Sequence, residues 1–332
     1  MSESILVTST SFLDTPGPHL EKLLECGFDI VQARGPLEEE ELIEIIKKSS
    51  GFDGIVCGTD FFTAKVLELC APRTRVISRY GVGLERVDLE HAEKLGIQVI
   101  NTPRFHHTTV CELTFGLMIA ISRKIPEHAN LVKNCEWTRM TGVELRNKVL
   151  TIFGFGMVGK DVAKIALSFG MKVIIHNSSW SDSHEEYFSA LKDSFSNRLL
   201  WEDLVLERCL DEEEALAKAD FISLHLDLNR NTQHFLDSRK ISLCKDGVFI
   251  INVSRGALIS EQCVADALNK NKIAGYAADV LEKQPVRCNN PLLTAKNVII
   301  TPHIGGRTFY SVYRQGLAAV DNLLKVLKPL NS

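Results

Sequence analysis

Short apolar runs alternate along the chain with segments whose apolar residues recur at helical spacing, and this alternation occurs in two series. The apolar runs predict strands, and the segments between them predict helices. In the first series the predicted strands are 5–7, 28–31, 54–57, 75–77 and 97–100, and the predicted helices are 18–26, 38–48, 63–70 and 89–95. Strands that alternate with helices indicate a parallel sheet with helices on both faces. The glutamates at 38–41 fit the start of a helix, where the macrodipole favours negative charge.

The second series begins at Val149, and it is flanked by an apolar helix predicted at 108–122 and an amphipathic helix predicted at 311–327. Its predicted strands are 149–153, 172–175, 221–224, 248–251, 274–277 and 298–300. The segment 178–210 is polar and longer than a strand-to-helix connection needs. We expect the first hundred residues to form a separate domain, to which the last helix returns.

The sequence GFGMVG at 154–159 follows the predicted strand 149–153 and opens a predicted helix that carries Val162, Ile165, Ala166 and Phe169 on one face. Strand, glycine-rich turn and helix in this order are typical of a dinucleotide site. The first glycine permits the tight turn, the second lets the backbone approach a pyrophosphate, and the third lets the helix pack on the strand. The helix N-terminus would then face the phosphates with its free N–H groups.

Composition narrows the class of protein. The chain has 332 residues, of which 45% are hydrophobic and 24% charged, with a formal net charge of -4. These values indicate a globular protein of about two domains without the basic excess that attracts nucleic acid or an anionic membrane. The first residues lack a basic region and no apolar stretch approaches a membrane span, so we expect no signal peptide and a cytoplasmic protein. The nine cysteines are scattered without a C-x-x-C pair, so we expect buried thiols and neither a metal site nor disulfides.

Two further side chains follow predicted strands of the second series. Arg255 comes after strand 248–251, and its guanidinium can fork onto the carboxylate and carbonyl oxygens of a 2-oxo acid. His303 comes after strand 298–300, and its imidazole can give a proton to the carbonyl oxygen or take it back. Ligands bind at the carboxyl ends of parallel strands, so we expect the two side chains to converge from neighbouring strand ends. Taken singly, each is also compatible with a structural role.

Together these motifs resemble the D-isomer-specific 2-hydroxy acid dehydrogenase family, which includes phosphoglycerate, glycerate and D-lactate dehydrogenases. The resemblance covers almost the whole chain, and the motifs that carry it occur in the family's order. They are 81–89, 101–103, 110–113, 154–159, 252–256 and 301–303.

The resemblance implies an α/β protein with two doubly wound parallel-sheet domains and an active-site cleft between them. A flavodoxin-like substrate domain would comprise 1–103 and 301–332, and a Rossmann NAD(P)-binding domain would comprise 104–300. The implied activity is hydride transfer between a nicotinamide cofactor, NAD or NADP, and C2 of a small 2-hydroxy acid, usually in a homodimer.

The resemblance also implies roles for single residues. Backbone N–H groups around Val82 and Gly83 would hold the substrate carboxylate, Arg255 would clamp the carboxylate and carbonyl, and His303 would be the acid/base. Further positions would line the cofactor groove: Phe155, Gly156, Met157, Val158, His225, Leu226, Asp227, Thr232, Val253, Ser254, Asp279, Gly305 and Gly306. Side chains in 59–62, 78–80 and 104–108 would set specificity for the acid.

One departure from the family concerns the partner of the histidine. The family normally has a glutamate just before the proline at 285, paired with the histidine, and here that residue is Gln284. A carboxylate beside an imidazole favours the charged ring, by about one to three pKa units, whereas glutamine orients the ring without adding charge. Glu282 lies two residues away and should point elsewhere. Formate dehydrogenases that resemble this family also carry glutamine there, although His106 replaces an asparagine that those enzymes often have.

A second departure concerns the cofactor. Strand 172–175 should end near an acidic residue that bonds the ribose 2′-hydroxyl of NAD, and Asn177 occupies that position. Without the carboxylate a 2′-phosphate is not repelled, and Ser178 and Ser179 can hydrogen-bond it. No arginine follows at once, the nearest being Arg198, so NAD is slightly favoured over NADP.

Two classes of function therefore remain open. The first is a dehydrogenase or reductase for a small 2-hydroxy or 2-oxo acid. No basic residue lies between Cys57 and Phe62, where phosphoglycerate enzymes tend to have an arginine, which argues against a phosphorylated substrate. The second is an NAD(H)-sensing binding protein on the same fold, as in transcriptional co-repressors that resemble these enzymes. Gln284 is the residue that supports this alternative.

Overall fold

The computed structural model describes residues 2–103, 105–196 and 205–327. The chain forms two compact units: unit 1 is Met1–His106 with Gly306–Ser332, and unit 2 is His107–Gly305. The sequence analysis placed the divisions after 103 and after 300. The loop that follows residue 300 stays with unit 2 because Asp279 holds it. The Asp279 carboxylate accepts hydrogen bonds from the N–H groups of Ile304 (2.9 Å) and Gly305 (2.7 Å).

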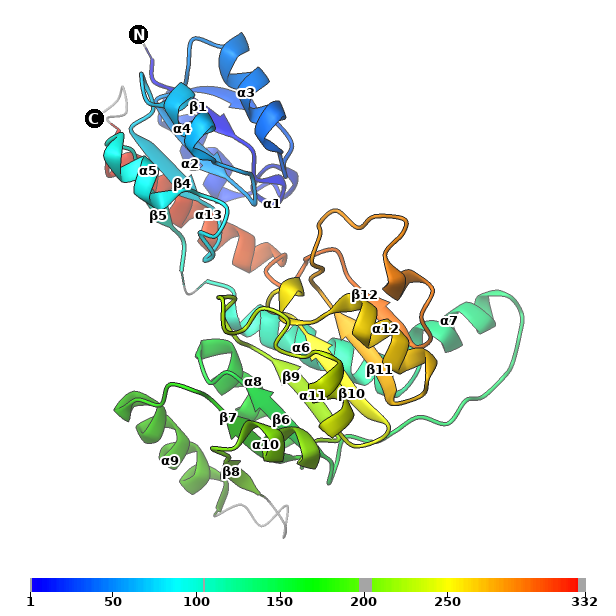
Figure 1. Cartoon of the computed structure of the whole chain (residues 1–332). Helices are drawn as coiled ribbons and strands as arrows, with labels where there is room; N and C mark the ends of the chain where they lie inside the picture. Colours follow the sequence, from blue (N-terminus) through cyan, green and yellow to red (C-terminus); the bar gives the residue numbers. More distant parts are fainter. Residues whose placement is uncertain (1, 104, 197–204, 328–332) are drawn as a thin grey trace. The chain divides into compact units, whose positions relative to one another are not determined.

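Unit 1 is built on a parallel sheet of five strands in the order β2-β1-β3-β4-β5 (Figure 1). Its strands are β1 (Ser4–Val7), β2 (Asp29–Gln32), β3 (Gly54–Cys57), β4 (Val76–Arg79) and β5 (Gln98–Asn101). Its helices are α1 (Thr10–Asp14), α2 (Pro18–Glu25), α3 (Glu39–Lys48), α4 (Ala64–Cys70), α5 (Leu89–Lys94) and α13 (Phe309–Leu324). One apolar core joins the sheet to α2 and α13, and a second joins it to α3, α4 and α5. Both the helix-covered sheet and the return of the last helix are therefore confirmed.

The start of α3 shows how local sequence sets an element boundary. Glu38 is the N-cap residue, and its backbone N–H donates to the side chain of Glu41 (2.9 Å), which closes a capping box. Acidic residues fill the first turn, where the helix dipole favours them, and lysines fill the last turn. The interpretation of 38–41 as a helix start is confirmed.

Unit 2 is built on a parallel sheet of seven strands in the order β12-β11-β10-β9-β6-β7-β8. Its strands are β6 (Val149–Phe153), β7 (Lys172–His176), β8 (Leu206–Arg208), β9 (Phe221–Leu224), β10 (Val248–Asn252), β11 (Ile273–Ala278) and β12 (Val298–Ile300). Its helices are α6 (His107–Ser122), α7 (Ile125–Lys133), α8 (Met157–Ser168), α9 (Asp182–Ser196), α10 (Glu212–Lys218), α11 (Ser238–Leu243) and α12 (Glu261–Asn269), with 3-10 turns η1 (Gly256–Leu258) and η2 (Pro291–Leu293). Helices α6, α8 and α9 share one core with the sheet, and α10, α11 and α12 share the other.

The described parts of the polar segment 178–210 include regular secondary structure that the sequence did not predict. The segment contains α9 and the edge strand β8, and its Arg198 lies outside the described residues. Phe169, the C-cap residue of α8, is 41% exposed, and its ring stacks on that of Phe115, which belongs to the core of unit 2 (ring centroids 5.3 Å apart). The other predicted apolar positions of α8 face the core of unit 2.

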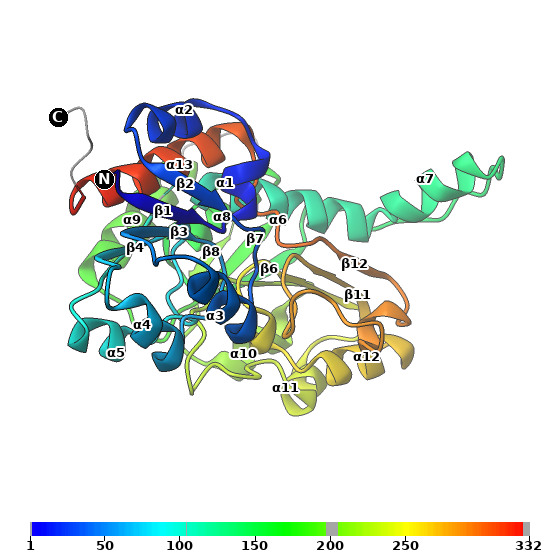
Figure 2. The same ribbon diagram turned by 90° about the horizontal axis from the view of Figure 1, so that it is seen from above.

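Helix α7 extends away from the sheet of unit 2 together with the segment that follows it (Figure 2). None of its residues is buried, and Trp137 in the following segment is 81% exposed. Within the described ranges, no helix combines the length and the apolar character needed to cross a membrane. Six of the nine cysteines are buried, as expected.

Candidate active site

The glycine-rich turn between β6 and α8 has the local geometry that a dinucleotide phosphate requires. Gly154 has φ +98°, and a Cβ there would collide with the backbone of His225. A Cβ at Gly159 would collide with the carbonyl oxygen of Gly154, so this glycine allows the helix to pack on the turn. A Cβ at Gly156 would meet nothing within 4 Å, so the backbone of this residue is open to approach from outside. Met157 and Val158 open α8, where backbone N–H groups favour an anion, and Phe155 completes the turn before them. The residues present therefore fit a pyrophosphate.

Asn177, just after β7, is tied to this turn. Its Oδ1 accepts a hydrogen bond from the backbone N–H of Phe155 (3.1 Å), and its Nδ2 donates to the carbonyl oxygen of Ser179. The amide therefore links the phosphate turn to the start of the polar segment after β7. A neutral side chain occupies the position where the carboxylate for a ribose was expected.

The loops after β9 and β10 form the next part of the same sheet edge. Ser254 donates through Oγ to the carbonyl oxygen of Leu226 (2.6 Å), which ties the two loops together. Thr232 closes the first loop by donating to the carbonyl oxygen of Asp227 (2.6 Å). Burial lowers the pKa of His225 to about 3, so its ring is neutral at physiological pH. Val253 is also buried, so its side chain supports the edge from beneath.

Arg255 stands at the carboxyl end of β10, in a loop with a fixed course. Asn252 accepts from the N–H of Ser254 (3.2 Å) through Oδ1 and donates to the carbonyl oxygen of Arg255 (3.0 Å) through Nδ2. Position 256, which follows Arg255, requires a glycine, because a Cβ on Gly256 would overlap the backbone of Leu281. The loop that carries Arg255 therefore packs directly on the segment that leads to Gln284.

His303 follows β12 and makes the hydrogen bond that the family resemblance implies. Its Nδ1 lies 2.8 Å from Oε1 of Gln284, while Nε2 of Gln284 donates to the carbonyl oxygen of Leu281 (3.2 Å). Because the amide nitrogen of Gln284 donates to Leu281, it is the amide oxygen that faces the ring. An oxygen can only accept, so Nδ1 of the ring is assigned as the protonated nitrogen. Nε2 of the neutral ring is then the atom that accepts a proton, and in the charged ring it donates one.

Asp279 holds the backbone around His303. The carboxylate is 2% exposed and accepts from Thr301 Oγ1 (2.6 Å) as well as from the N–H groups of Ile304 and Gly305. The N–H of His303 also donates to the carbonyl oxygen of Asp279 (3.0 Å), and the ring is carried on a residue with φ +55°. Sequence reasoning did not single out Thr301, whose hydroxyl completes this set.

Glu282 is directed away from His303, as expected. Its Oε1 lies 3.0 Å from Nε2 of His234, and its backbone N–H donates to Oε1 of Glu261 (2.9 Å). Glu261 also accepts from the side chain of Asn290 (2.8 Å), so this carboxylate fixes both ends of the loop that carries Gln284. Sequence reasoning missed this role, because Glu261 simply opens a helix in the sequence.

Arg255 and His303 come from the same sheet edge but not from adjacent strands. The strand ends Asn252, Ala278 and Ile300 are level, with β11 between β10 and β12. The expectation of neighbouring strands is therefore wrong by one strand. The ends of β10 and β12 are two strand spacings apart, which is about 10 Å. The arginine side chain is long enough for its guanidinium and the imidazole to contact the same small acid.

The predicted anion site of unit 1 lies in the loop after β4. The carbonyl oxygen of Gly81 accepts from the N–H of Thr102 (3.0 Å), and that of Val82 accepts from Nδ2 of Asn101 (2.8 Å). Because trans peptides point N–H and C=O in opposite directions, the N–H groups of Val82 and Gly83 are turned away from these partners. Val82 is 42% exposed, so this backbone can be reached.

One other expectation in unit 1 is changed by the structure. Ser78 was expected to face a ligand, but it is buried and donates to the carbonyl oxygen of Ala319 (2.9 Å). The boundary between the two units falls between Gly305 and Gly306, and the place of these glycines at the cofactor groove stays a prediction. Arg104 lies outside the described residues.

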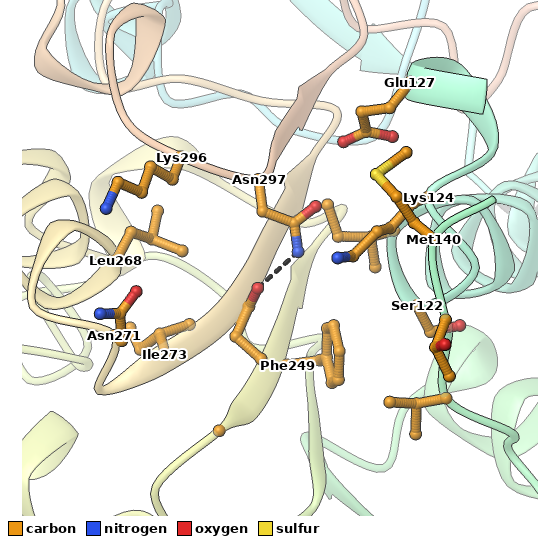
Figure 3. Close-up of a pocket in the computed structure, with 15 residues that line it drawn as sticks. Ser122, Lys124, Glu127, Met140, Phe249, Leu268, Asn271, Ile273, Lys296 and Asn297 are labelled. Carbon is orange, nitrogen blue, oxygen red and sulfur yellow. Dashed lines mark hydrogen bonds between the residues drawn. The ribbon is translucent and has the colours of Figure 1, made fainter. Parts of the chain in front are cut away.

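A cavity of about 480 Å³ in unit 2 lies at the opposite edge of the sheet (Figure 3). Its lining includes Phe249, Ile273 and Asn297, at the amino ends of β10, β11 and β12, and Lys124 and Met140 at the base of the α7 segment. None of the predicted site residues lines it. Because ligands of parallel sheets bind at the carboxyl ends of the strands, this cavity is not the candidate active site.

Comparison with known proteins identifies the family. Residues 115–305 match the family model described as D-isomer specific 2-hydroxyacid dehydrogenase, NAD binding domain. A D-3-phosphoglycerate dehydrogenase of Methanocaldococcus jannaschii is 36% identical over 309 residues, which cover 92% of this chain and 55% of that protein. The chain thus spans about half the length of this relative. A hydroxypyruvate reductase of Thermotoga maritima is 33% identical over 295 residues, covering 88% of this chain and 89% of that protein.

A solved structure shares the fold of this chain. The TT0316 protein of Thermus thermophilus has a TM-score of 0.82 and 30% identity, with 98% of each chain covered. The matched family model covers more than half of the chain, and the first relative matches nearly all of it. This chain therefore belongs to the D-isomer-specific 2-hydroxy acid dehydrogenase family.

Proposed function

We propose that this protein is an oxidoreductase that transfers a hydride between NAD(P)(H) and C2 of a small 2-hydroxy or 2-oxo acid. The single observation that supports this most directly is the hydrogen bond between Nδ1 of His303 and Oε1 of Gln284. It orients the ring with Nδ1 as the donor to Gln284, so that Nε2 is the ring nitrogen that can accept a proton. The phosphate turn at 154–159 and the Arg255 loop lie at the carboxyl edge of the same sheet.

Each side chain has one task in this proposal. The bound nicotinamide supplies or receives the hydride. Arg255 binds the substrate carboxylate and the adjacent oxygen, which fixes C2 and its carbonyl in one plane. During reduction, Nε2 of the charged His303 ring gives its proton to the carbonyl oxygen, and in oxidation the neutral ring removes the proton from the hydroxyl. The N–H groups of Val82 and Gly83 are the proposed second contact of the carboxylate.

The proposed substrate is a small, unphosphorylated 2-oxo acid. Residues 58–61 after β3 contain no arginine or lysine that would pair with a phosphate. The Thermotoga maritima relative is named for hydroxypyruvate, and curated relatives from other organisms are named for glyoxylate. These names support a two- or three-carbon acid, with hydroxypyruvate and glyoxylate as the first to assay.

The test is a screen of NADH and NADPH oxidation with glyoxylate, hydroxypyruvate, pyruvate and larger 2-oxo acids. We expect turnover with at least one small acid, and loss of turnover with retained cofactor binding in Arg255→Gln. Tight cofactor binding without turnover of any acid would contradict the proposal and favour the NAD(H)-sensing alternative. Reduction of NAD⁺ by formate, assayed in parallel, would favour the formate alternative that Gln284 keeps open.

We propose that a second copy of the chain covers α7. This helix presents Ile125 and Val132 to solvent at 48% and 55% exposure, and none of its residues is buried in its own unit. Apolar groups exposed in this way on a projecting segment are typical of an interface. Sedimentation equilibrium should give a dimer, and Val132→Glu should weaken it. A monomer at micromolar concentration would contradict this part of the proposal.

A further inference from the structure

The end of the cofactor groove farthest from His303 carries a cation that the sequence analysis did not place. Arg208 is the last residue of β8, the strand that pairs with β7, and it is level with Ile175 in the register of the two strands. Asn177 follows β7 at the same edge. The structure therefore brings a guanidinium to the strand beside Asn177, although the two residues are far apart in the sequence.

A stack of aromatic rings fixes where Arg208 lies. Its Cζ sits 4.2 Å from the ring centroid of Trp180, as a cation over an indole face. The indole stacks in turn on the ring of Phe155, with centroids 5.4 Å apart and planes 2° from parallel. Phe155 is fully buried and is part of the phosphate turn itself. The position of the guanidinium is thus tied, through two rings, to the loop that would hold the pyrophosphate.

Neighbouring groups keep this arrangement in place. Lys160 in the first turn of α8 donates to the carbonyl oxygen of Ser183 (3.2 Å), which anchors the start of α9. Glu185 is an acidic group close to the stack, and both its oxygens are used. One accepts from Nε1 of Trp180 (2.9 Å) and the other from Ser189 Oγ (3.3 Å). Glu207, beside Arg208 in the sequence, faces Lys218 (3.2 Å).

We propose that Arg208, with the hydroxyls of Ser178 and Ser179, forms a subsite for the 2′-phosphate of NADPH, and that this protein binds NADPH more tightly than NADH. This inference rests on the proposed function, because it assigns the adenosine end of the same cofactor groove. A 2′-phosphate needs a guanidinium and hydroxyl donors near the end of β7, and it needs that end to lack a carboxylate. Ser178 and Ser179 follow directly after Asn177, whose own side chain is neutral and occupied by backbone groups.

The proposal reverses the slight preference for NAD drawn from the sequence. That preference depended on finding no arginine soon after Asn177. Sequence distance is a poor guide here, because the arginine arrives from the adjacent parallel strand rather than from the loop after β7. Asn177 and Arg208 both favour NADPH over NADH. The neutral side chain of Asn177 does not repel a 2′-phosphate, and the guanidinium of Arg208 attracts it.

Calorimetric titration of the whole chain with NADH, NADPH and adenosine 2′,5′-bisphosphate tests the subsite without requiring turnover. Wild type should bind NADPH at least tenfold more tightly than NADH. Arg208→Gln should weaken the binding of NADPH and of the bisphosphate about tenfold or more, and it should change the affinity for NADH less than twofold. The affinities of Arg208→Lys for NADPH and the bisphosphate should lie between those of wild type and Arg208→Gln. Arg146→Gln, an exposed change just before the amino end of β6, is the matched control and should change none of the three.

Two outcomes would overturn the inference. One is equal weakening of NADH and NADPH by Arg208→Gln, and the other is a wild type that binds NADH as tightly as NADPH. Failure of the proposed function looks different, because it would leave the binding of NADPH and the bisphosphate intact while no 2-oxo acid is reduced. Circular dichroism of Arg208→Gln should match wild type, which separates lost binding from lost folding.

Discussion

Two positions in unit 2 carry an amide where the family pattern leads one to expect a carboxylate, and they lie at opposite ends of the same sheet edge. Gln284 hydrogen-bonds the ring of His303, and Asn177 hydrogen-bonds the backbone of Phe155 in the phosphate turn. In both places the amide keeps a hydrogen bond and removes a negative charge. The difference expected at each end is therefore one of charge.

The consequences differ because the neighbours differ. Beside His303 the missing charge would act on the group that we propose exchanges protons, so the expected effect is on pH dependence. Beside the phosphate turn it would act on the bound cofactor, so the expected effect is on the choice of cofactor. Restoring each carboxylate separately should therefore change one property and leave the other unchanged. Variants at each position can test whether the two effects are separable.

The largest expected effect comes from removing the imidazole ring that we propose as the acid/base. His303→Asn should lower kcat/KM for reduction of the preferred 2-oxo acid by about 10²- to 10⁴-fold, the usual contribution of a general acid/base. The affinity for the cofactor should change less than twofold, because the asparagine leaves the phosphate turn intact. Steady-state rates and calorimetric titration measure the two quantities. Retention of more than a tenth of the wild-type rate would show that another group carries the proton.

Asn177→Asp should weaken the binding of NADPH by about ten- to a hundredfold, because the variant places a carboxylate next to the 2′-phosphate. NADH should bind equally well or somewhat more tightly, since the carboxylate can accept from the ribose hydroxyls. Titration with both reduced cofactors measures this. The pH dependence of turnover with saturating NADH should be unchanged. If NADPH binding were unaffected, Asn177 would not be near the 2′ position.

Gln284→Glu is the matching change beside His303. A carboxylate stabilises the charged imidazole, so proton donation should persist to higher pH. We expect the high-pH limb of the 2-oxo acid reduction profile to move upward by about one to three pH units, with the ratio of NADPH to NADH affinity unchanged. A pH-rate profile of kcat/KM measures the shift. If the limb stays where it is in wild type, the interpretation of Gln284 as a neutral orienting group is wrong.

The sequence predicted the parts of this molecule that long apolar runs define. Central strands such as β6 and β10 are buried on both faces, so they appear in the sequence as continuous apolar stretches. The glycine-rich turn was predicted because its three glycines occur at a short, fixed spacing. The edge strand β8 was missed because an edge strand of three residues needs no apolar run.

Contacts across the sheet were the least predictable part of the site. That Arg208 lies over Trp180 depends on the register between β7 and β8, and that Glu261 supports the loop of Gln284 depends on the packing of α12. Neither is encoded by nearby residues. The pairing of His303 with Gln284 was found in advance only through the family resemblance, because the two residues belong to different loops.

The smallest expected effect serves as the control for Gln284. Glu282 is the carboxylate closest in sequence, and it pairs with His234 rather than with His303. Glu282→Gln should therefore leave the pH-rate profile within about 0.2 pH units of wild type, while weakening of a partly exposed hydrogen bond to His234 should lower the free energy of unfolding by at most about 1 kcal/mol. Rate profiles and thermal unfolding measure these changes. A high-pH limb that retreats by half a unit or more would mean that Glu282 does act on the ring. The charge missing from Gln284 would then be supplied from two residues away, and the two amide positions would no longer be comparable.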